Sequence, residues 1–175
     1  MKDRKLLNIE LGRISADEYK DLPPSGLVVV LDNIRSAHNV GSAFRTADSF
    51  GIDKVFLCGI SAVPPSAEIH KSALGAEDSV PWEHVDDTLE AVRRLRADGY
   101  TVVAVEQTVH SVKLGAFRRD PGRTSALIFG NEVTGVRQDV VDASDFSLEI
   151  PQFGTKHSLN VSVSVGVVLW EMVRR

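Results

Sequence analysis

The chain has 175 residues, of which 43% are hydrophobic and 25% are charged. This composition is typical of a folded globular protein and excludes a disordered chain. A single cysteine, Cys58, excludes an intramolecular disulfide and a zinc site built from cysteine alone. The formal net charge of −4, from 20 basic and 24 acidic residues, argues against a general polyanion-binding protein but allows a local basic patch.

The sequence indicates neither a targeting signal nor a membrane segment. The start, MKDRKLLNIE, has charges on both sides of a short apolar pair, unlike a secretory signal. The longest apolar runs, at 27–31 and 165–170, are far shorter than the ~20 residues of a spanning helix. We therefore expect a soluble, cytoplasmic protein with one domain over residues 1–175 and no membrane partner. Residues 1–25 are expected to form a helical extension ahead of the core.

Strands and helices are predicted to alternate along the chain, which indicates a mostly parallel α/β sheet with helices on both faces. The β-branched run at 27–32 predicts a buried strand. Apolar residues from Asn39 to Gly51 recur with a helical period, with Asn39 as the expected N-cap and Gly51 as the stop. Further strands are predicted at 54–59, 101–106, 125–130 and 147–151, helices at 66–74 and from Asp86 or Asp87 to Ala97, and a loop with at most one short helix at 107–124.

The last segment fits two patterns. Residues 161–165 alternate between apolar and polar as a strand would, whereas Leu159, Val163 and Trp170 fit one face of a helix. We predict a helix, because a sixth strand would leave one side of the sheet poorly covered. Trp170 and Val173 then either join the core or form a helix–helix interface between two copies.

Ligands of open α/β sheets bind outside the carboxyl ends of the strands. Polar loops follow the predicted strands at 33–48, 106–111, 130–137 and 151–160. None of them carries GxGxxG or GxxxxGK[ST], and the chain has no HExxH, no GxSxG and no paired Cys/His set. Standard dinucleotide, phosphate-loop, zinc and serine-hydrolase sites therefore lack support, and we expect no metal.

Three polar residues in these loops have more than one interpretation. Glu132, between Gly130 and Gly135, favours a neutral or cationic ligand over a phosphate, but it could also be a capping residue in a tight turn. Arg45 could pair with an acid or grip a phosphate with two hydrogen bonds. His157 is expected to be a surface or substrate contact rather than a metal ligand.

Together the loops resemble the three motifs of the SpoU–TrmH branch of the SPOUT superfamily, a family of RNA ribose 2′-O-methyltransferases. The first motif, N-x-G-S-A-x-R-T-A-D-x-x-G, matches Asn39 to Gly51. The second, F-G-N-E-x-x-G, matches Phe129 to Gly135, and the third, I-P-x-x-G-x-x-x-S-L-N-V-S-V, matches Ile150 to Val163. The resemblance covers roughly residues 26–173 and departs from the family at Gln152, where methionine is usual.

This resemblance implies an α/β sheet whose C-terminal segment forms a deep trefoil knot, although knots are very rare in proteins. It also implies a homodimer with the active site at the subunit boundary. The implied cofactor is S-adenosylmethionine, a sulfonium cation bound in the knot. The residues expected to bind it are Val105, Glu106, Gly130, Ile150, Ser158 and Leu159.

The resemblance also assigns catalytic residues. We expect Arg45 to grip a phosphate and stabilise an alkoxide, because a guanidinium stays protonated and is a poor base. Asn39, Glu132 and Asn160 match the other active-site positions, and Glu132 is expected to orient Arg45 or Asn160. The candidates for RNA binding are Arg13, Arg35, Arg118, Arg119, Arg123, Lys156 and His157.

The implied methyl acceptor is the 2′-hydroxyl of an RNA nucleotide. The chain resembles the minimal single-domain members, which often act on tRNA, so we expect tRNA as the substrate. Ribosomal RNA is the alternative substrate, and an inactive module that binds S-adenosylmethionine or RNA is an alternative function. A nucleotide-dependent oxidoreductase is disfavoured by the missing glycine fingerprint.

Overall fold

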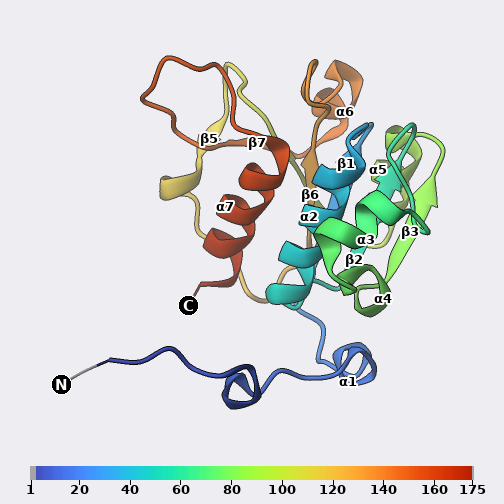
Figure 1. Ribbon diagram of the computed structural model, residues 1–175. Helices are drawn as coiled ribbons and strands as arrows, with labels where there is room; N and C mark the ends of the chain where they lie inside the picture. The colour runs from blue at the N-terminus through green and yellow to red at the C-terminus, as the bar shows by residue number, and fades with distance from the viewer. Residues whose placement is uncertain (1–2, 175) are drawn as a thin grey trace.

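The computed structural model describes residues 3–174, which form a seven-stranded sheet with parallel neighbours throughout (Figure 1). The strands are β1 (Leu27–Asp32), β2 (Lys54–Cys58), β3 (Trp82–Val85), β4 (Thr101–Val105), β5 (Val112–Lys113), β6 (Ser125–Phe129) and β7 (Phe146–Glu149). Their order across the sheet is β3-β2-β1-β6-β4-β7-β5. The predicted α/β class and the parallel sheet are confirmed. The sequence pattern does not predict β3 and β5, because so few residues show no period.

Helices cover both faces of this sheet, as predicted. One face carries α2 (Ala37–Ser49), α3 (Ala67–Ala73) and α7 (Val161–Val173), and the other carries α5 (Thr88–Ala97) and α6 (Gln138–Ala143). The shorter helices are η1 (Asn8–Leu11), α1 (Ala16–Lys20), α4 (Ala76–Ser79) and η2 (Leu114–Ala116). Neither α4 nor α6 is predicted by the sequence pattern, since both are too short for a clear helical period.

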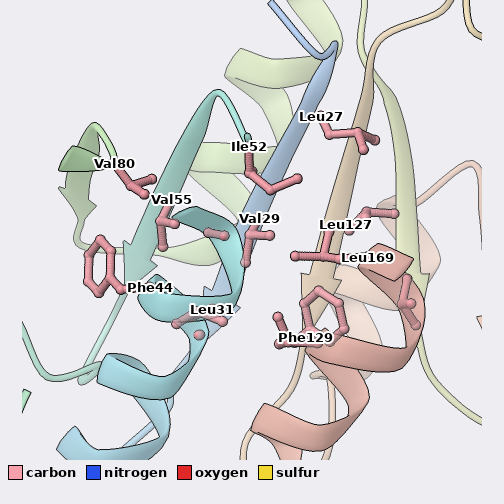
Figure 2. Packing of buried hydrophobic residues seen from close by; sticks show 14 of the residues in the cluster. Leu27, Val29, Leu31, Phe44, Ile52, Val55, Val80, Leu127, Phe129 and Leu169 are labelled. Atoms are coloured by element: carbon pink, nitrogen blue, oxygen red, sulfur yellow. The ribbon is translucent and has the colours of Figure 1, made fainter. Parts of the chain in front are cut away.

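The core has two halves, one on each face of the sheet. Because side chains alternate along a strand, Val29 and Leu31 of β1 face α2 and α7, whereas Val30 faces α5. Figure 2 shows the first half, in which Phe44 of α2 and Leu169 of α7 pack over the strands. Burying each such side chain contributes roughly 1.5–3 kcal/mol to stability. These two helices therefore lock the ends of β1 and β6 into place.

The start of α2 differs from the prediction. The N-cap is Ser36, whose hydroxyl accepts a hydrogen bond from the Asn39 amide at 3.2 Å. Asn39 was expected as the cap but lies inside the first turn, where it is only 7% exposed. Serine is as good a cap as asparagine, so the earlier residue starts the helix and frees the Asn39 side chain. The predicted stop is confirmed, since Gly51 follows the C-cap with φ of 62°.

The last segment is a helix, as predicted, and Asn160 is its N-cap. Trp170 on this helix is 59% exposed and packs beside Phe50, with ring centroids 6.1 Å apart. The alternative that Trp170 belongs to the core is therefore wrong within this chain. No helix of residues 3–174 has both the length and the apolar character needed to cross a bilayer.

The N-terminal extension consists of two short helices, η1 and α1, rather than one continuous helix. Tyr19 of α1 anchors it, since its buried hydroxyl donates hydrogen bonds to the carbonyls of Ile52 at 3.0 Å and Ala47 at 3.2 Å. The residues before α1 run away from the sheet (Figure 1). The extension is thus fixed to the core only at its C-terminal end, near the start of β2.

Candidate active site

A cavity of about 480 Å³ opens at the carboxyl ends of β4, β6 and β7. These strands are neighbours in the sheet, so the loops that follow them meet at one edge (Figure 1). The residues expected to bind the cofactor all line this cavity, and they are Val105, Glu106, Gly130, Ile150, Ser158 and Leu159. The structure brings together residues that lie far apart in the sequence, while their role in binding stays a prediction.

Two glycines shape the loop after β6. A Cβ atom on Gly130 would come within 2.0 Å of the Val136 nitrogen, so the loop can turn back only on a glycine. Gly135 has φ of 69°, and a Cβ there would meet the Glu106 carboxylate at 2.2 Å. That carboxylate accepts a hydrogen bond from the Val136 amide at 2.9 Å. Glu106 at the end of β4 therefore fastens the neighbouring loop.

Asn131 holds the same loop from inside, although the sequence analysis did not single it out. Its side chain donates to the Asn33 carbonyl at 2.6 Å and accepts from the Val133 amide at 2.9 Å. Its backbone exchanges two hydrogen bonds with Gly135. Asparagine commonly bonds the backbone two residues on, so an asparagine placed directly after Gly130 was a usable signal.

Asp32 is a second residue that the sequence analysis missed. It ends β1, is fully buried, and accepts hydrogen bonds from the Thr88 hydroxyl at 2.5 Å and the Arg137 amide at 3.1 Å. The carboxylate thereby joins α5 and the end of the loop after β6 to the central strand. The signal was an acid at the end of an otherwise apolar strand, where a buried charge needs partners.

One residue from each sequence motif meets beside the cavity. Glu132 accepts a hydrogen bond from the Asn39 side-chain nitrogen at 3.1 Å, and the Asn39 oxygen accepts from the Asn160 nitrogen at 3.2 Å. The Asn160 oxygen in turn accepts from the Ser162 amide at 2.9 Å, which caps α7. The hydrogen bonds run in one direction, so they fix which way each amide group points.

The carboxylate of Glu132, at one end of this series of hydrogen bonds, is held in its ionised form. Partial burial acts to raise the pKa of Glu132, but hydrogen bonds from Asn39 and from the backbone amides of Glu132, Ser36 and Arg35 outweigh it, so the pKa is lowered. The N-terminus of α2 lies at the same place and also favours a negative charge. The capping interpretation of Glu132 thus holds in part, since the carboxylate accepts from the Ser36 amide at 3.2 Å.

We expected Glu132 to orient Arg45 or Asn160 directly. Within the described chain, its carboxylate contacts neither of these side chains. Its side-chain partner is Asn39, which stands between Glu132 and Asn160 because the N-cap of α2 is Ser36 and not Asn39. Arg45 lies six residues after Asn39, about 120° around the helix and ~9 Å along its axis. It is exposed, and no partner among residues 3–174 binds its guanidinium. Arg45, which we expected to be catalytic, therefore makes no contact with the Asn39–Glu132–Asn160 network of its own chain.

The expected RNA-binding residues fall into two groups. Arg35, Lys156 and His157 lie at the carboxyl edge of the sheet, where His157 lines the cavity. The His157 carbonyl also accepts a hydrogen bond from the Gln107 side chain at 2.7 Å, which joins two of the loops. This group surrounds the candidate site and is exposed.

The second group lies elsewhere. Arg119 donates to the carbonyl of Ser25, which lies two residues before β1, at 2.5 Å, and Arg123 lies two residues before β6. Both residues are therefore at the amino ends of strands, about 16 Å or one strand length from the cavity edge. Arg118 is 4.0 Å from Glu171 near the end of α7, and Arg13 belongs to the N-terminal extension. The structure does not bring these four to the site.

The described part of the chain contains no cluster of three His, Cys, Asp or Glu side chains placed to hold a metal ion. Among the described residues that line the cavity there is also no lysine or arginine, while Glu106, Glu132 and Glu149 are present. Glutamate carboxylates repel phosphate groups and attract cations. The cavity is therefore suited to a neutral or positively charged ligand.

Comparison with known proteins adds a family to this geometry. The model of the SpoU rRNA Methylase family matches residues 26–170. A 23S rRNA (guanosine-2′-O-)-methyltransferase, RlmB, of Nitrosomonas europaea is 36% identical over 163 residues, which cover 91% of this chain and 60% of the relative. A tRNA (guanosine(18)-2′-O)-methyltransferase of Aquifex aeolicus is 32% identical, covering 85% of this chain and 69% of the relative.

A solved structure shares the fold. The AdoMet-bound rRNA methyltransferase from Sinorhizobium meliloti superposes with a TM-score of 0.79 at 28% identity, covering 88% of this chain and 59% of that one. The chain thus spans less than two thirds of the length of the first ribosomal-RNA relatives that it matches. The shared region includes the whole cavity and the three motifs, since both lie within residues 26–170.

Proposed function

The chain belongs to the SpoU rRNA Methylase family, and from that premise we propose that it transfers a methyl group from S-adenosylmethionine to a ribose 2′-hydroxyl of RNA. The observation that carries the proposal is that Asn39, Glu132 and Asn160, one from each motif, meet beside a cavity whose described lining contains no lysine or arginine. Hydrogen-bonded asparagines could serve the fold alone. These lie beside a cavity that suits a cation, which supports a role in transferring the methyl group from a sulfonium donor.

The cavity fits this donor in size and in chemistry. Small-molecule sites usually measure ~300–1,000 Å³, and this one measures about 480 Å³. Apolar side chains such as Val105, Ile150 and Leu159 would contact the adenine, while backbone groups at Gly130 would approach it closely. Glu106 would favour the positive sulfur. When bound, S-adenosylmethionine supplies a methyl group on a positively charged sulfur, which makes that carbon electrophilic.

The residues of the chain position the acceptor. The ionised Glu132 holds Asn39, and Asn39 holds Asn160, so the remaining N–H groups of both amides are free to donate to ribose oxygens. Arg45 binds the neighbouring phosphate and stabilises the alkoxide that forms as the hydroxyl loses its proton to solvent water. Placing the acceptor oxygen in line with the methyl carbon supplies much of the rate enhancement.

In this proposal Arg45 acts across a homodimer. Its guanidinium has no partner among the described residues of its own chain, and it lies on an exposed face of α2. On the adjacent α7, Val163, Val167 and Trp170 form an exposed apolar stripe at the spacing of one helix face. A second copy that covers this stripe would bring its α2 toward the first cavity. The site is then completed at the subunit boundary.

We also propose that the C-terminal segment forms the trefoil knot of the family. The strand order supports this, because β7 lies between β4 and β5, which come earlier in the chain. The segment that leads into α7 therefore leaves from within the sheet and not from its edge. The loop at 151–160 and the N-terminus of α7 then close the cavity.

For the substrate we propose tRNA, with ribosomal RNA as the alternative and the cytoplasm as the place of action. Relatives of both kinds support an RNA substrate. The decisive experiment maps 2′-O-methylated nucleotides by mass spectrometry in tRNA and rRNA from cells with and without the gene. A nucleotide that loses its methyl group in tRNA supports the proposal, and one lost only in rRNA supports the alternative substrate.

A variant at Arg45 tests the chemistry. We expect Arg45→Ala to reduce methyl transfer to total RNA by at least about a hundred-fold, as the loss of one transition-state donor does. Its stability should change by no more than about 0.5 kcal/mol, because the side chain is exposed. Transfer is measured with radiolabelled donor, and stability by urea unfolding. Donor binding by the wild type without transfer to any RNA would indicate the inactive module instead.

A further inference from the structure

Three apolar side chains stand almost fully exposed around the mouth of the cavity. Val109 is 94% exposed, Val133 is 85% exposed and Phe153 is 95% exposed. They come from three different loops, which follow β4, β6 and β7. Val133 itself lines the cavity, while Val109 and Phe153 directly follow the lining residues Thr108 and Gln152. All three therefore stand on the loops that surround the mouth of one cavity, at the ends of neighbouring strands.

Phe153 is the unusual member of this group. Other phenylalanines at the surface pack on a second ring: Phe117 lies 5.4 Å from Phe146, and Phe50 lies 6.1 Å from Trp170. Phe153 has no ring partner within the described chain and belongs to neither core cluster. Because the ring is exposed, it does not stabilise the folded chain by packing. An aromatic ring held in this way is available to stack against a flat ligand.

The charges nearby point to the kind of ligand. Ten of the 18 lysine and arginine side chains that the structure describes form an ion pair, as Arg137 does with Asp87 and Asp139. Arg35, Lys156 and His157, at the same edge as Phe153, form no ion pair with any residue that the structure describes. Unpaired basic groups beside an exposed ring are the usual combination for single-stranded nucleic acid, since the cations bind phosphates and the ring stacks on a base.

A second copy of the chain is the less favoured occupant. The three side chains stand on loops between polar residues or glycine, such as Thr108, Thr134 and Gly154, and do not form a continuous apolar face. The exposed stripe on α7 provides a continuous face for a dimer instead. The mouth of the cavity therefore remains open to a substrate.

We infer that Phe153 is the platform on which the base of the methylated nucleotide stacks, with Val109 and Val133 enclosing it. This inference rests on the proposed function and adds a requirement to it. A base can stack on Phe153 only when it is unpaired and turned out of a helix, so the enzyme selects nucleotides in single-stranded loops. Phe153 contacts the substrate base and contributes nothing to donor binding.

The test uses a short single-stranded RNA that carries 2-aminopurine, whose fluorescence is quenched when it stacks. Binding is measured for the wild type, Phe153→Ala, Phe153→Leu and Phe153→Tyr. We expect alanine and leucine to weaken binding about ten-fold or more and to abolish quenching, because one base on one aromatic ring is worth at least a factor of this order. Phe153→Tyr should retain both the RNA affinity and the fluorescence quenching. Ile60→Ala, an exposed apolar residue outside the cavity, is the matched control and should bind as the wild type does.

Three outcomes would overturn the inference. Equal RNA binding by all variants shows that Phe153 is not a contact, and full retention by leucine shows that no stacking occurs. Dissociation of the dimer by Phe153→Ala, measured by sedimentation, shows that a second copy covers the ring. Calorimetry with S-adenosylhomocysteine should give unchanged affinity in every variant. A wild type that quenches the probe but methylates no RNA refutes the proposed function and leaves only the stacking of an RNA base on Phe153.

Discussion

The Glu132 carboxylate has two tasks at the scale of a single residue. It accepts hydrogen bonds from the backbone at the start of α2, and it orients the Asn39 amide. Both tasks need an acceptor on each oxygen, and neither needs a proton. The residue therefore acts as an ionised acceptor that positions its neighbours, rather than as the base that removes the ribose proton.

Replacing Glu132 by glutamine tests this role. The glutamine amide nitrogen would face other N–H donors, so we expect methyl transfer to fall at least about ten-fold while donor binding is retained. Because folding lowers the pKa of this carboxyl, its contribution to stability is present above the unfolded pKa of about 4.3 and is lost as the pH falls through the folded value. Melting curves should therefore show a gap between wild type and variant at pH 7 that narrows below about pH 4. A gap that is the same at both pH values would contradict this role.

How much of the site could be predicted depends on the residue. The motif pattern placed Asn39, Glu132 and Asn160 in one active site, and they do lie together. The same pattern could not show that Asn39 stands between the other two, because this depends on whether Ser36 or Asn39 caps α2. Asn131 was missed because its partners are backbone groups, so the only signal was the general preference of asparagine for turns.

At the scale of elements, the close approach of α2 and α3 depends on Gly41. A Cβ atom at this position would come within 2.0 Å of the Ser72 hydroxyl and 2.4 Å of the Ile69 carbonyl. We expect Gly41→Ala to destabilise the protein by about 1–3 kcal/mol, the usual range for overpacking. Ser42→Ala on the same helix is the control and should stay within about 0.5 kcal/mol. Equal urea midpoints for the two variants would show that the helices can separate freely.

Asn160 joins the start of α7 to the active site, and two substitutions separate these roles. Asn160→Asp keeps an oxygen that caps the helix but loses the nitrogen that donates to Asn39. We expect this variant to remain as stable as the wild type within about 0.5 kcal/mol and to lose methyl transfer. Asn160→Ala should lose both the helix cap and methyl transfer, and losing the cap should cost about 0.5–2 kcal/mol of stability. Unfolding curves and transfer assays measure the two effects, and an active Asn160→Asp enzyme would exclude the network from catalysis.

Periodicity predicted the longer elements well and the short ones poorly. The buried strand β1 and the amphipathic α2 each contain enough residues to show their period. Helix α6, with the sequence QDVVDA, offers only one turn and a half, and its position depends on the loop before it. The ambiguous segment at 161–173 was resolved by asking what would cover the sheet, not by its own pattern.

For the whole molecule, the exposure of Trp170 leads to a prediction about assembly. Because this side chain is 59% exposed, Trp170→Glu should leave the folded subunit intact but place a charge in the proposed dimer face. We expect sedimentation to show monomers and methyl transfer to disappear. Circular dichroism should remain that of the wild type. A fully active monomer would contradict a site shared between two copies.

The order of strands and the location of the basic residues could not be predicted from the sequence. Segment 107–124 leaves β4 at the carboxyl ends of the strands and enters β6 at their amino ends. It therefore carries Arg119 and Arg123 away from the cavity. Sequence spacing contains no measure of this path. The family resemblance named the residues of the site, but only the strand order shows which basic residues lie beside it.

The insertion of β7 between β4 and β5 has a consequence for synthesis on the ribosome. While the polypeptide is being made, residues 103–105 can pair with β6 on one side, but their other side and residues 112–113 have no hydrogen-bonding partner in the sheet, because residues 146–149 appear later. The wall formed by Leu148 and Ile150 is missing from the nascent chain during that time. A product that stopped before Leu159 would therefore lack part of the cavity in which we propose that the methyl donor binds.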